Sequence, residues 1–470
     1  MASSRKSPRD STLLARVTAV LRRYVRRGDR LVVGLSGGFD SVVLLDLLQR
    51  AARRLGFRLA AVHVNHQLNP SAGAWATFCR VLCRGYAIAL TVKRVEVRRG
   101  NSLEAAARAA RYGVYASLRS DAIVLAHNLD DQAETLLLQL LRGTGLKGAS
   151  AMPEYRVEDR GSRIENSATR TKAKHSAQSS IRNPALLRPL LDVPRSEIAA
   201  YARTRKLAWI EDDSNADTAF DRNFVRHQVL PAIAGRFPAY RQTLSRASRH
   251  FAEAAELADG CAMADAGDCG NLLDLGRLRV LSAARVKNAL RYFLARKGIL
   301  MPNARRLDEC VRQLLQSGAG AGMTMRLGDY ELRCYGDQLH VIPVTAKMVA
   351  PFAQRAWRGE SRLQLPELGG VLSMTPRRGA GISLEQLAGG NVTVRVRQGG
   401  ERLQIDRARP RRTLKNLWQE ARIPEWRRGR LPLLFVGDKL AFVAGIGVAS
   451  AFQARTGEPG IEPDWRPALG

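Results

Sequence analysis

The first third of the chain alternates between short apolar runs and longer segments whose apolar residues have helical spacing. The strand-like runs cover residues 30–36, 59–66, 89–97 and 122–127. The helix-like segments between them cover 40–56, 71–86, 101–119 and 129–143. Apolar strands separated by helices of this length predict parallel β-α units with both sheet faces covered. We therefore expect an α/β fold with a parallel, Rossmann-like sheet that binds ligands at the strand carboxyl ends.

The pattern changes twice further along, and each change marks an expected boundary. Residues 156–183 are polar, rich in Ser, Arg and Lys and poor in large apolar groups, which predicts a flexible basic insertion. We expect the sheet domain to span 1–235. Helical and then mixed patterns over 236–345 predict a small second domain. Alternating strands with a helix at 413–424 predict a C-terminal α+β domain over 390–460.

The charge balance narrows the range of partners. Lys and Arg total 75 against 43 Asp and Glu, for a net charge of +32. This excess favours a polyanionic partner, although a solvated Arg-rich surface is the alternative explanation. Nucleic acid is favoured over a membrane because no run approaches the ~20 apolar residues of a membrane span. The N-terminus has no secretory signal, and six cysteines without a C-x-x-C pair indicate reduced thiols in a cytoplasm.

The sequence SGGFDS at residues 36–41 joins a predicted strand to a predicted helix. Glycines let backbone N–H groups approach an anion, serines add donors, and the helix N-terminus carries partial positive charge. Ser36, Gly37, Gly38 and Ser41 are therefore predicted to cradle phosphates. Asp40 would be repelled there unless Mg²⁺ bridges it to a nucleotide. A helix cap is the alternative role for Asp40.

An ordered series of motifs resembles one known family. The loop resembles that of the N-type ATP pyrophosphatases, which cleave ATP between its α and β phosphates. HVNHQLNP, NSLEAAARAARY, AHNLDDQAET, LLRPLL and EDDSNADTAFDRNFVR follow it in that order. This series is similar to the tRNA(Ile)-lysidine synthases, whose terminal domain resembles the segments VRVRQGGERL and LKNLWQEARIPEWRRGRLPLLF. Asn69 stands where the family usually has Arg, and Asn128 where a second His is common.

The resemblance implies a two-step reaction on RNA. ATP would adenylate the C2 oxygen of the wobble cytidine in the isoleucine tRNA with a CAU anticodon. The α-amine of L-lysine would then displace AMP and leave lysidine. ATP and Mg²⁺ are the implied cofactors, tRNA and lysine the implied partners, and a homodimer stays open. A tRNA thiolase with the same nucleotide chemistry and a non-catalytic RNA-binding protein are the rival functions.

Five residues carry this implied chemistry. Asp40 and Asp131 are the predicted metal ligands. Asp131 and Glu134 lie three apart on one helical face, so they also suit the ammonium groups of lysine or a base. Arg226 is predicted to stabilise phosphate charge, and His127 to contact nucleotide or RNA. An acidic helix N-terminus favoured by the helix dipole is the alternative explanation of the two carboxylates.

Basic residues predicted to contact tRNA are Arg108, Arg111, Arg188, Arg222, Arg395, Arg397, Arg402, Lys415, Arg427, Arg428 and Arg430. Contacts to phosphates position RNA without reading its sequence, and they make binding salt-dependent. Arg188 resembles a family arginine that faces the site. Residues 213–215 are expected to fix the loop before Arg222. For Trp418 and Trp426, core packing is favoured over stacking on bases.

Overall fold

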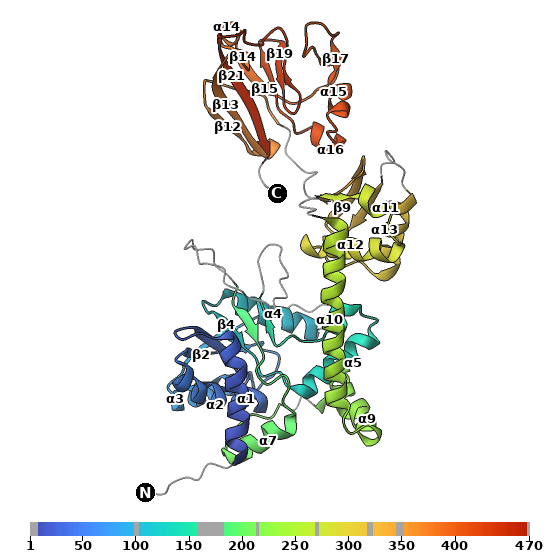
Figure 1. Ribbon diagram of the computed structural model, residues 1–470. Helices are drawn as coiled ribbons and strands as arrows, with labels where there is room; N and C mark the ends of the chain where they lie inside the picture. Colours follow the sequence, from blue (N-terminus) through green and yellow to red (C-terminus); the bar gives the residue numbers. More distant parts are fainter. Residues whose placement is uncertain are drawn as a thin grey trace. The chain divides into compact units, whose positions relative to one another are not determined.

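The computed structural model describes residues 8–97, 103–157, 183–212, 216–267, 272–316, 323–344 and 352–467 (Figure 1). Almost all of the predicted insertion at 156–183 lies outside these residues, as do residues 213–215. The chain divides into two compact units. The first unit comprises Met1–Asp265 and Arg291–Ile299, and the second comprises Ala266–Leu290 and Leu300–Gly470.

A six-stranded sheet with the order β3-β2-β1-β4-β6-β5 forms the centre of the first unit. All neighbouring strands are parallel except β5, which runs antiparallel to β6. The strands are β1 (Arg30–Gly34), β2 (Arg58–Asn65), β3 (Ala89–Arg94), β4 (Ala122–Val124), β5 (Tyr155–Arg156) and β6 (Ala185–Leu187). The predicted parallel sheet is confirmed. Strand β6 was not expected, because three apolar residues are too few to distinguish a strand from other structure.

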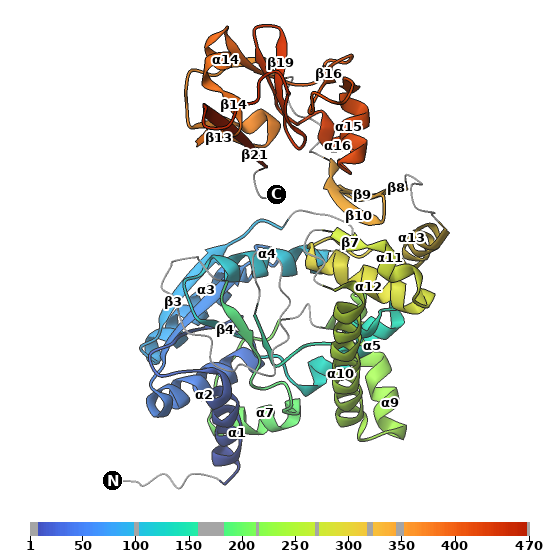
Figure 2. The same ribbon diagram turned by 45° about the horizontal axis from the view of Figure 1, so that its top comes forward.

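Helices cover both faces of this sheet (Figure 2). They are α1 (Pro8–Tyr24), α2 (Phe39–Leu55), α3 (Ala72–Gly85), α4 (Leu103–Ser117), α5 (Leu129–Leu141), α6 (Leu146–Ala149) and α7 (Arg195–Thr204). Leu31 and Val33 of β1 share one buried cluster with residues of α1, α2 and α7. Val32, between them, packs in a different cluster with Tyr115 of α4. Successive strand side chains point to opposite faces, so both faces are buried as the apolar runs predict.

Four further helical elements of the first unit lie beside α5. They are α8 (Asp221–Phe224), the π-helical turn η2 (Val225–Val229), α9 (Leu230–Arg236) and α10 (Tyr240–Ala266). Ala133 of α5 forms one buried cluster with Val225, Leu230 and Tyr240. Both views place α9 and α10 next to α5. This packing holds the start of α10 against the sheet domain, and the first unit extends through Asp265.

The second unit begins with a small antiparallel sheet of order β7-β10-β9-β8. Its strands are β7 (Leu272–Asp274), β8 (Thr324–Leu327), β9 (Tyr330–Tyr335) and β10 (Gln338–Pro343). The helices of this stretch are α11 (Leu275–Arg279), α12 (Ala283–Arg296) and α13 (Ala304–Gln316). The end of α12, from Arg291, belongs to the first unit. None of the helices in the described ranges is both long and apolar enough to cross a membrane.

The C-terminal part of the second unit contains two larger antiparallel sheets, of orders β11-β15-β18-β19-β20 and β12-β13-β21-β14, and the pair β16-β17. Its elements are β11 (Arg355–Ala356), β12 (Arg362–Leu365), η4 (Pro366–Leu368), β13 (Gly370–Arg378), β14 (Ile382–Ser383), α14 (Leu384–Ala388), β15 (Val392–Arg395), β16 (Arg402–Leu403), β17 (Arg412–Thr413), α15 (Leu414–Glu420), α16 (Glu425–Arg428), β18 (Leu433–Val436), β19 (Lys439–Val443), β20 (Gly447–Val448) and β21 (Pro459–Pro467). Trp418 is fully buried in this core, which confirms core packing for that residue.

Candidate active site

The sheet topology brings two predicted motifs to one edge. Strand β1 pairs with β2 on one side and with β4 on the other. The chain therefore leaves neighbouring strands in opposite directions, which opens a crevice at their carboxyl ends. The loop at residues 36–41 follows β1, and the segment from His127 to Glu134 follows β4. This crevice is the candidate active site.

The loop after β1 is stabilised by hydrogen bonds among its own residues and by one hydrogen bond from Ile210. Ser41 Oγ donates to Gly38 O at 2.8 Å, and Gly38 N donates to Ser36 Oγ at 3.2 Å. Gly37 has a φ of 91°, and a Cβ added there would lie 2.8 Å from Ile210 Cδ1. Glycine is therefore required both by the backbone and by the available space. Gly37 O accepts a hydrogen bond from Ile210 N at 3.0 Å.

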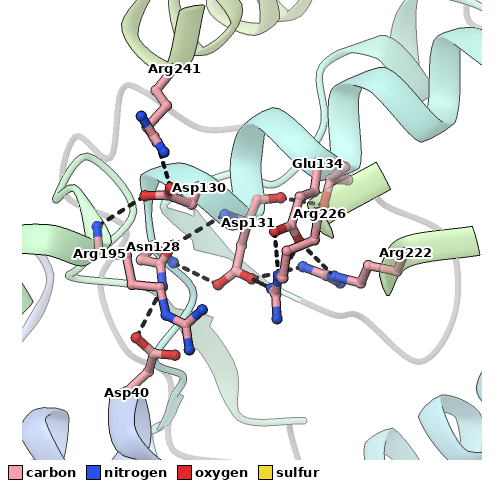
Figure 3. Close-up of polar contacts among 10 residues, drawn as sticks. Asp40, Asn128, Asp130, Asp131, Glu134, Arg195, Arg222, Arg226 and Arg241 are labelled. Carbon is pink, nitrogen blue, oxygen red and sulfur yellow. Dashed lines mark hydrogen bonds and ion pairs between the residues drawn. The ribbon is translucent and has the colours of Figure 1, made fainter. Parts of the chain in front are cut away.

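Asp40 lies in the first turn of α2 and points into the site (Figure 3). Asn128 Nδ2 donates to Asp40 Oδ1 at 3.1 Å. Burial and the nearby charge of Asp131 raise the pKa of Asp40 to about 6, although Arg195 and the Asn128 hydrogen bond act in the opposite direction. The positive charges near Asp40 thus do not fully offset its burial and the charge of Asp131. The carboxylate would be stabilised by a cation bound beside it.

Asn128 connects Asp40 to the start of α5. As the N-cap residue of that helix, it accepts a hydrogen bond from Asp131 N through Oδ1 at 3.1 Å. Its own N–H donates to Asp131 Oδ2 at 3.0 Å, which completes a capping box. In the sequence, Asn128 stands out only as a departure from the family pattern. The signal for its role was an Asn followed three residues later by an acid, just before an apolar helix.

Two arginines neutralise the two carboxylates of α5. Arg226 Nε donates to Glu134 Oε1 at 2.6 Å, and Arg226 Nη2 lies 3.1 Å from Asp131 Oδ1. Arg222 Nε donates to Glu134 Oε2 and Arg222 Nη2 to Asp131 Oδ1, each at 2.9 Å. The two arginines lie four residues apart on α8 and η2, so both reach α5 (Figure 3). Each guanidinium thus spans two carboxylates, an arrangement favoured by its planar set of donors.

This ion-pair cluster changes what Asp131 can do. Its Oδ1 accepts from both arginines and its Oδ2 accepts from Asn128 N. Burial acts to raise the pKa of Asp131, but Arg222, His127 and Arg226 outweigh it and lower the pKa below its ordinary value. Asp131 is therefore a weak base. Both its oxygens already accept hydrogen bonds from the protein, so it has fewer free acceptor sites for a metal ion than Asp40 has.

Asp40 fits a magnesium ion better than Asp131 does. Only one Asp40 oxygen accepts a hydrogen bond from the residues that the structure describes. No cluster of three or more His, Cys, Asp or Glu suited to a metal occurs in the described ranges. Mg²⁺ commonly binds through one or two carboxylates together with substrate phosphates and water. A single carboxylate beside a phosphate loop satisfies that requirement.

Asp130 holds α5 against two other helices. Its Oδ1 pairs with Arg241 Nε of α10 at 2.5 Å, and its Oδ2 accepts from Arg195 N at the start of α7 at 2.9 Å (Figure 3). Both partners come from segments far along the chain. Asp130 therefore ties the first turn of α5 to both α7 and α10.

Arg188 requires a correction, because it lies inside the protein. Its side chain is 2% exposed, donates from Nε to His127 Nδ1 at 3.2 Å and from Nη1 to Pro153 O at 2.7 Å. It is thus unavailable to tRNA phosphates. Burial lowers the pKa of His127 to about 3; Asp131 opposes this shift, and Arg188 adds to it. His127 is therefore a neutral ring at neutral pH. Arg222 also needs reassignment from RNA to the ion-pair cluster.

The other predicted RNA contacts fall into two groups. On α4, Arg108 and Arg111 are exposed, and Arg108 Nη2 donates to Tyr112 Oη at 3.3 Å. In the second unit, Arg402, Lys415 and Arg427 are exposed and Arg430 is half-buried. A pocket of about 520 Å³ there is lined by Arg397, Gln398, Gly399, Lys415, Glu425, Arg428 and Gly429. Arg428 also requires a correction from an exposed RNA contact, because it is buried and donates to Ile423 O and Tyr335 Oη. Arg395 donates to Thr393 Oγ1 and Gly437 O.

Two buried thiols of the sheet domain, Cys79 and Cys83, are unsuited to nucleophilic chemistry. Cys79 and Cys83 are buried in the core between the sheet and α3. Burial raises the pKa of Cys79 to about 12 and that of Cys83 to about 11. Thiolate is the reactive form of cysteine, so both residues are inert at neutral pH. They are packing residues, as their helical spacing indicates.

The parallel sheet and the SGGxDS loop at its switch point define a PP-loop ATP-binding domain, and a family model described as the PP-loop domain matches residues 10–233. Models described as the TilS substrate binding domain and the TilS substrate C-terminal domain match 273–340 and 392–465. The chain belongs to the tRNA(Ile)-lysidine synthase family. A relative of that name from Nitrosomonas europaea is 44% identical over 95% of this chain and 94% of its own. Relatives of the same name from Azoarcus sp. and Chromobacterium violaceum are 41% and 40% identical, over 93% of this chain and 92% and 95% of theirs.

Proposed function

We propose that this protein uses ATP to attach L-lysine to C2 of the wobble cytidine in the isoleucine tRNA with a CAU anticodon. One observation carries the proposal. The phosphate loop and Asp40 stand at the same sheet edge as the arginine–carboxylate cluster of α5 and η2. That arrangement suits a reaction in which a nucleotide and a second, charged substrate meet. The names of the relatives, matched over nearly their whole length, supply the substrate class.

The proposed first step forms an adenylated cytidine. The C2 oxygen of the base attacks the α-phosphorus of ATP, and pyrophosphate leaves. Ser36, Gly38 and Ser41 would bind the departing phosphates by exchanging their hydrogen bonds within the loop for bonds to phosphate oxygens, aided by the N-terminus of α2. Asp40 would hold Mg²⁺, which when bound neutralises phosphate charge. Adenylation makes the oxygen a good leaving group.

The proposed second step forms the carbon–nitrogen bond. The neutral α-amine of lysine attacks C2, AMP leaves with the C2 oxygen, and the amine loses a proton. Since Asp131 and Glu134 are already paired with arginines, we assign them to positioning Arg222 and Arg226 rather than to binding the lysine ammonium groups. Arg226 would then stabilise the charge of the phosphate at the reacting end. Electrostatic groups held rigidly in this way contribute strongly to catalysis.

We propose that RNA is bound by exposed basic side chains on both units. Arg108 and Arg111 of α4 belong to the unit that carries the active site. Lys415 and Arg397 line the basic pocket of the second unit, and Arg402, Arg427 and Arg430 are further candidate contacts in that unit. Phosphate contacts of this kind position tRNA and release counterions. A homodimer, one option from the sequence, stays a prediction that sedimentation would test.

The decisive experiment offers labelled lysine, ATP and Mg²⁺ to the protein with a transcript of the CAU isoleucine tRNA. We expect label in RNA and one AMP formed for each lysine attached. The methionine elongator tRNA, which shares the CAU anticodon, is the control and should remain unlabelled. Sulfur transfer to the RNA, or binding of tRNA without AMP formation, would favour one of the two rival functions instead.

A further inference from the structure

Arg188 and His127 meet because their strands are neighbours. Strands β4 and β6 are parallel, with Val124 opposite Leu187. Arg188 is the first residue after β6, and His127 lies three residues after β4. Both therefore emerge at the carboxyl edge that carries the phosphate loop. Arg188 Nε donates to His127 Nδ1 at 3.2 Å.

Arg188 is held rigidly from several sides. Its backbone N–H donates to Glu154 O at 2.8 Å, and its Nη1 donates to Pro153 O at 2.7 Å. The hydroxyl of Tyr112 on α4 is a further hydrogen-bond partner of its side chain. The side chain is 2% exposed, so it does not exchange these partners for water. The direction in which Nε points is thus set by the fold.

The hydrogen bond fixes where the imidazole carries its proton. A guanidinium Nε always bears a hydrogen and never accepts. Nδ1 of His127 must therefore accept, and a neutral imidazole has only one N–H. That N–H is on Nε2. If Nδ1 also carried a proton, its N–H would face the N–H of Arg188 Nε, and two positively charged groups would be in contact.

The free edge of the His127 ring faces outward from this contact. His127 is partly exposed, whereas Arg188 behind it is not. Within the described ranges, Nδ1 is the ring nitrogen for which a hydrogen bond to the protein is found. Asp131, Arg222 and Arg108 are close enough to interact electrostatically with the ring. Nε2–H is therefore an available donor beside the charged cluster of the active site.

We propose that Arg188 is a positioning residue that locks His127 as a neutral donor, with its proton on Nε2, for an acceptor oxygen of the bound substrate. His127 then contributes a hydrogen bond, and it does not shuttle protons. The substrate part of this inference rests on the proposed function. The state of the ring does not, because it follows from the Arg188 contact alone.

Nitrogen NMR of the full chain labelled with ¹⁵N-histidine tests the state of the ring. The chain has 7 histidines, and the signals of residue 127 are those lost in His127→Gln. At pH 7 we expect a non-protonated Nδ1 and a protonated Nε2. In Arg188→Met, the two nitrogens should move toward averaged shifts, while the exposed Arg203→Met on α7 should leave them unchanged. A protonated Nδ1 in the parent, or an unchanged tautomer in Arg188→Met, would overturn the proposal.

Single-turnover formation of the adenylated tRNA tests the role of the donor. Glutamine can donate a hydrogen bond but cannot carry a proton between groups. We expect His127→Gln to stay within about tenfold of the parent rate and His127→Ala to lose about 10²-fold. Equal losses in both variants would mean that proton transfer matters, and no loss in His127→Ala would mean that the donor does not. If no adenylation occurs even in the parent, the proposed function fails while the NMR result still stands.

Discussion

Asn128 Nδ2 lies 3.1 Å from Asp40 Oδ1, while Asn128 Oδ1 accepts the backbone N–H of Asp131. One buried amide thus joins the helix that follows the phosphate loop to the helix that carries the charged cluster. The two helices begin after neighbouring strands, so this bond connects the two halves of the candidate active site. It also orients the carboxylate proposed to hold Mg²⁺.

Asn128→Asp and Asn128→Ala should distinguish the two roles of Asn128, which caps α5 and donates a hydrogen bond to Asp40. Aspartate is as good an N-cap as asparagine, but it replaces the donor to Asp40 with a like charge. Because Asn128 is buried, we expect Asn128→Asp to keep the helix cap, to lose stability at neutral pH through the like charge beside Asp40, and to lose adenylation at least about tenfold. Asn128→Ala should lose both activity and about 1 kcal/mol of stability. Urea unfolding and AMP formation measure the two effects, and full activity in Asn128→Asp would contradict the bridging role.

The raised pKa of Asp40 gives a pH dependence of stability with a defined sign. The pKa in the folded protein is about 6, above the ordinary value of 3.8. Proton binding by Asp40 therefore stabilises the fold fully below pH 3.8, and this contribution is lost as the pH rises through 6. Without Mg²⁺, Asp40→Asn should be more stable than the parent at pH 8 and equally stable near pH 3.5. Urea unfolding at both pH values measures this difference.

The same variant tests what Asp40 does in the reaction. Asp40→Asn should abolish adenylation and leave tRNA affinity within a few-fold of the parent. In the parent, adenylation should fall as the pH drops below 6, because the protonated carboxyl cannot hold Mg²⁺. A large loss of tRNA binding in Asp40→Asn would instead show that Asp40 supports the fold.

Gly37→Ala should disable the phosphate loop. The new Cβ would lie 2.8 Å from Ile210 Cδ1, at a φ of 91° that disfavours alanine. The loop must move, so ATP binding should weaken at least about tenfold while the rest of the sheet domain stays folded. Gly85→Ala is the matched control, because no atom lies within 4 Å of its Cβ position. Calorimetric titration with ATP compares the two, and equal affinities would show that the loop tolerates a side chain.

Breaking the arginine–carboxylate cluster should cost stability as well as activity. Glu134 has a side chain that is 1% exposed, so Arg226→Met leaves buried negative charge with one arginine fewer. We expect a loss of about 1–3 kcal/mol. The exposed Arg246→Met on α10 should change the free energy of unfolding by less than about 0.5 kcal/mol. The double variant Arg226→Met with Glu134→Leu should lose less than the sum of the single losses, and strict additivity would contradict the pairing.

A role of the basic pocket in RNA binding should appear in the salt dependence of the affinity for tRNA. Lys415 lines the pocket and is exposed, so Lys415→Gln should remove one phosphate contact. The slope of log affinity for tRNA against log salt should become shallower by about one. Lys439→Gln on β19, exposed but outside the pocket lining, is the control with the same charge change. Filter binding from low to moderate salt measures the slopes, and equal slopes in both variants would remove the pocket from the RNA path.

Local patterns in the sequence were enough to predict much of the fold of the sheet domain. The alternation of apolar strands and helices from residue 30 to residue 143 predicted the sheet and the helices that cover it, because burial on both faces leaves a periodic record. Residues 36–41 identified the phosphate loop, because glycine spacing and hydroxyls are needed at fixed steps along the backbone. Asp131 and Glu134 were correctly placed on one helical face for the same reason.

Only the tertiary structure decided which charged groups pair with which. The sequence predicts that Asp131 and Glu134 suit a metal contact, the ammonium groups of lysine or a base. The sequence does not reveal that Arg222 and Arg226, some 90 residues away along the chain, pair with both carboxylates. Arg188 was predicted as an RNA contact, yet strand β6 carries it beneath His127. The residue type alone does not tell whether an arginine is exposed or buried. The difference arises from strand order and from distances between segments that no local pattern records.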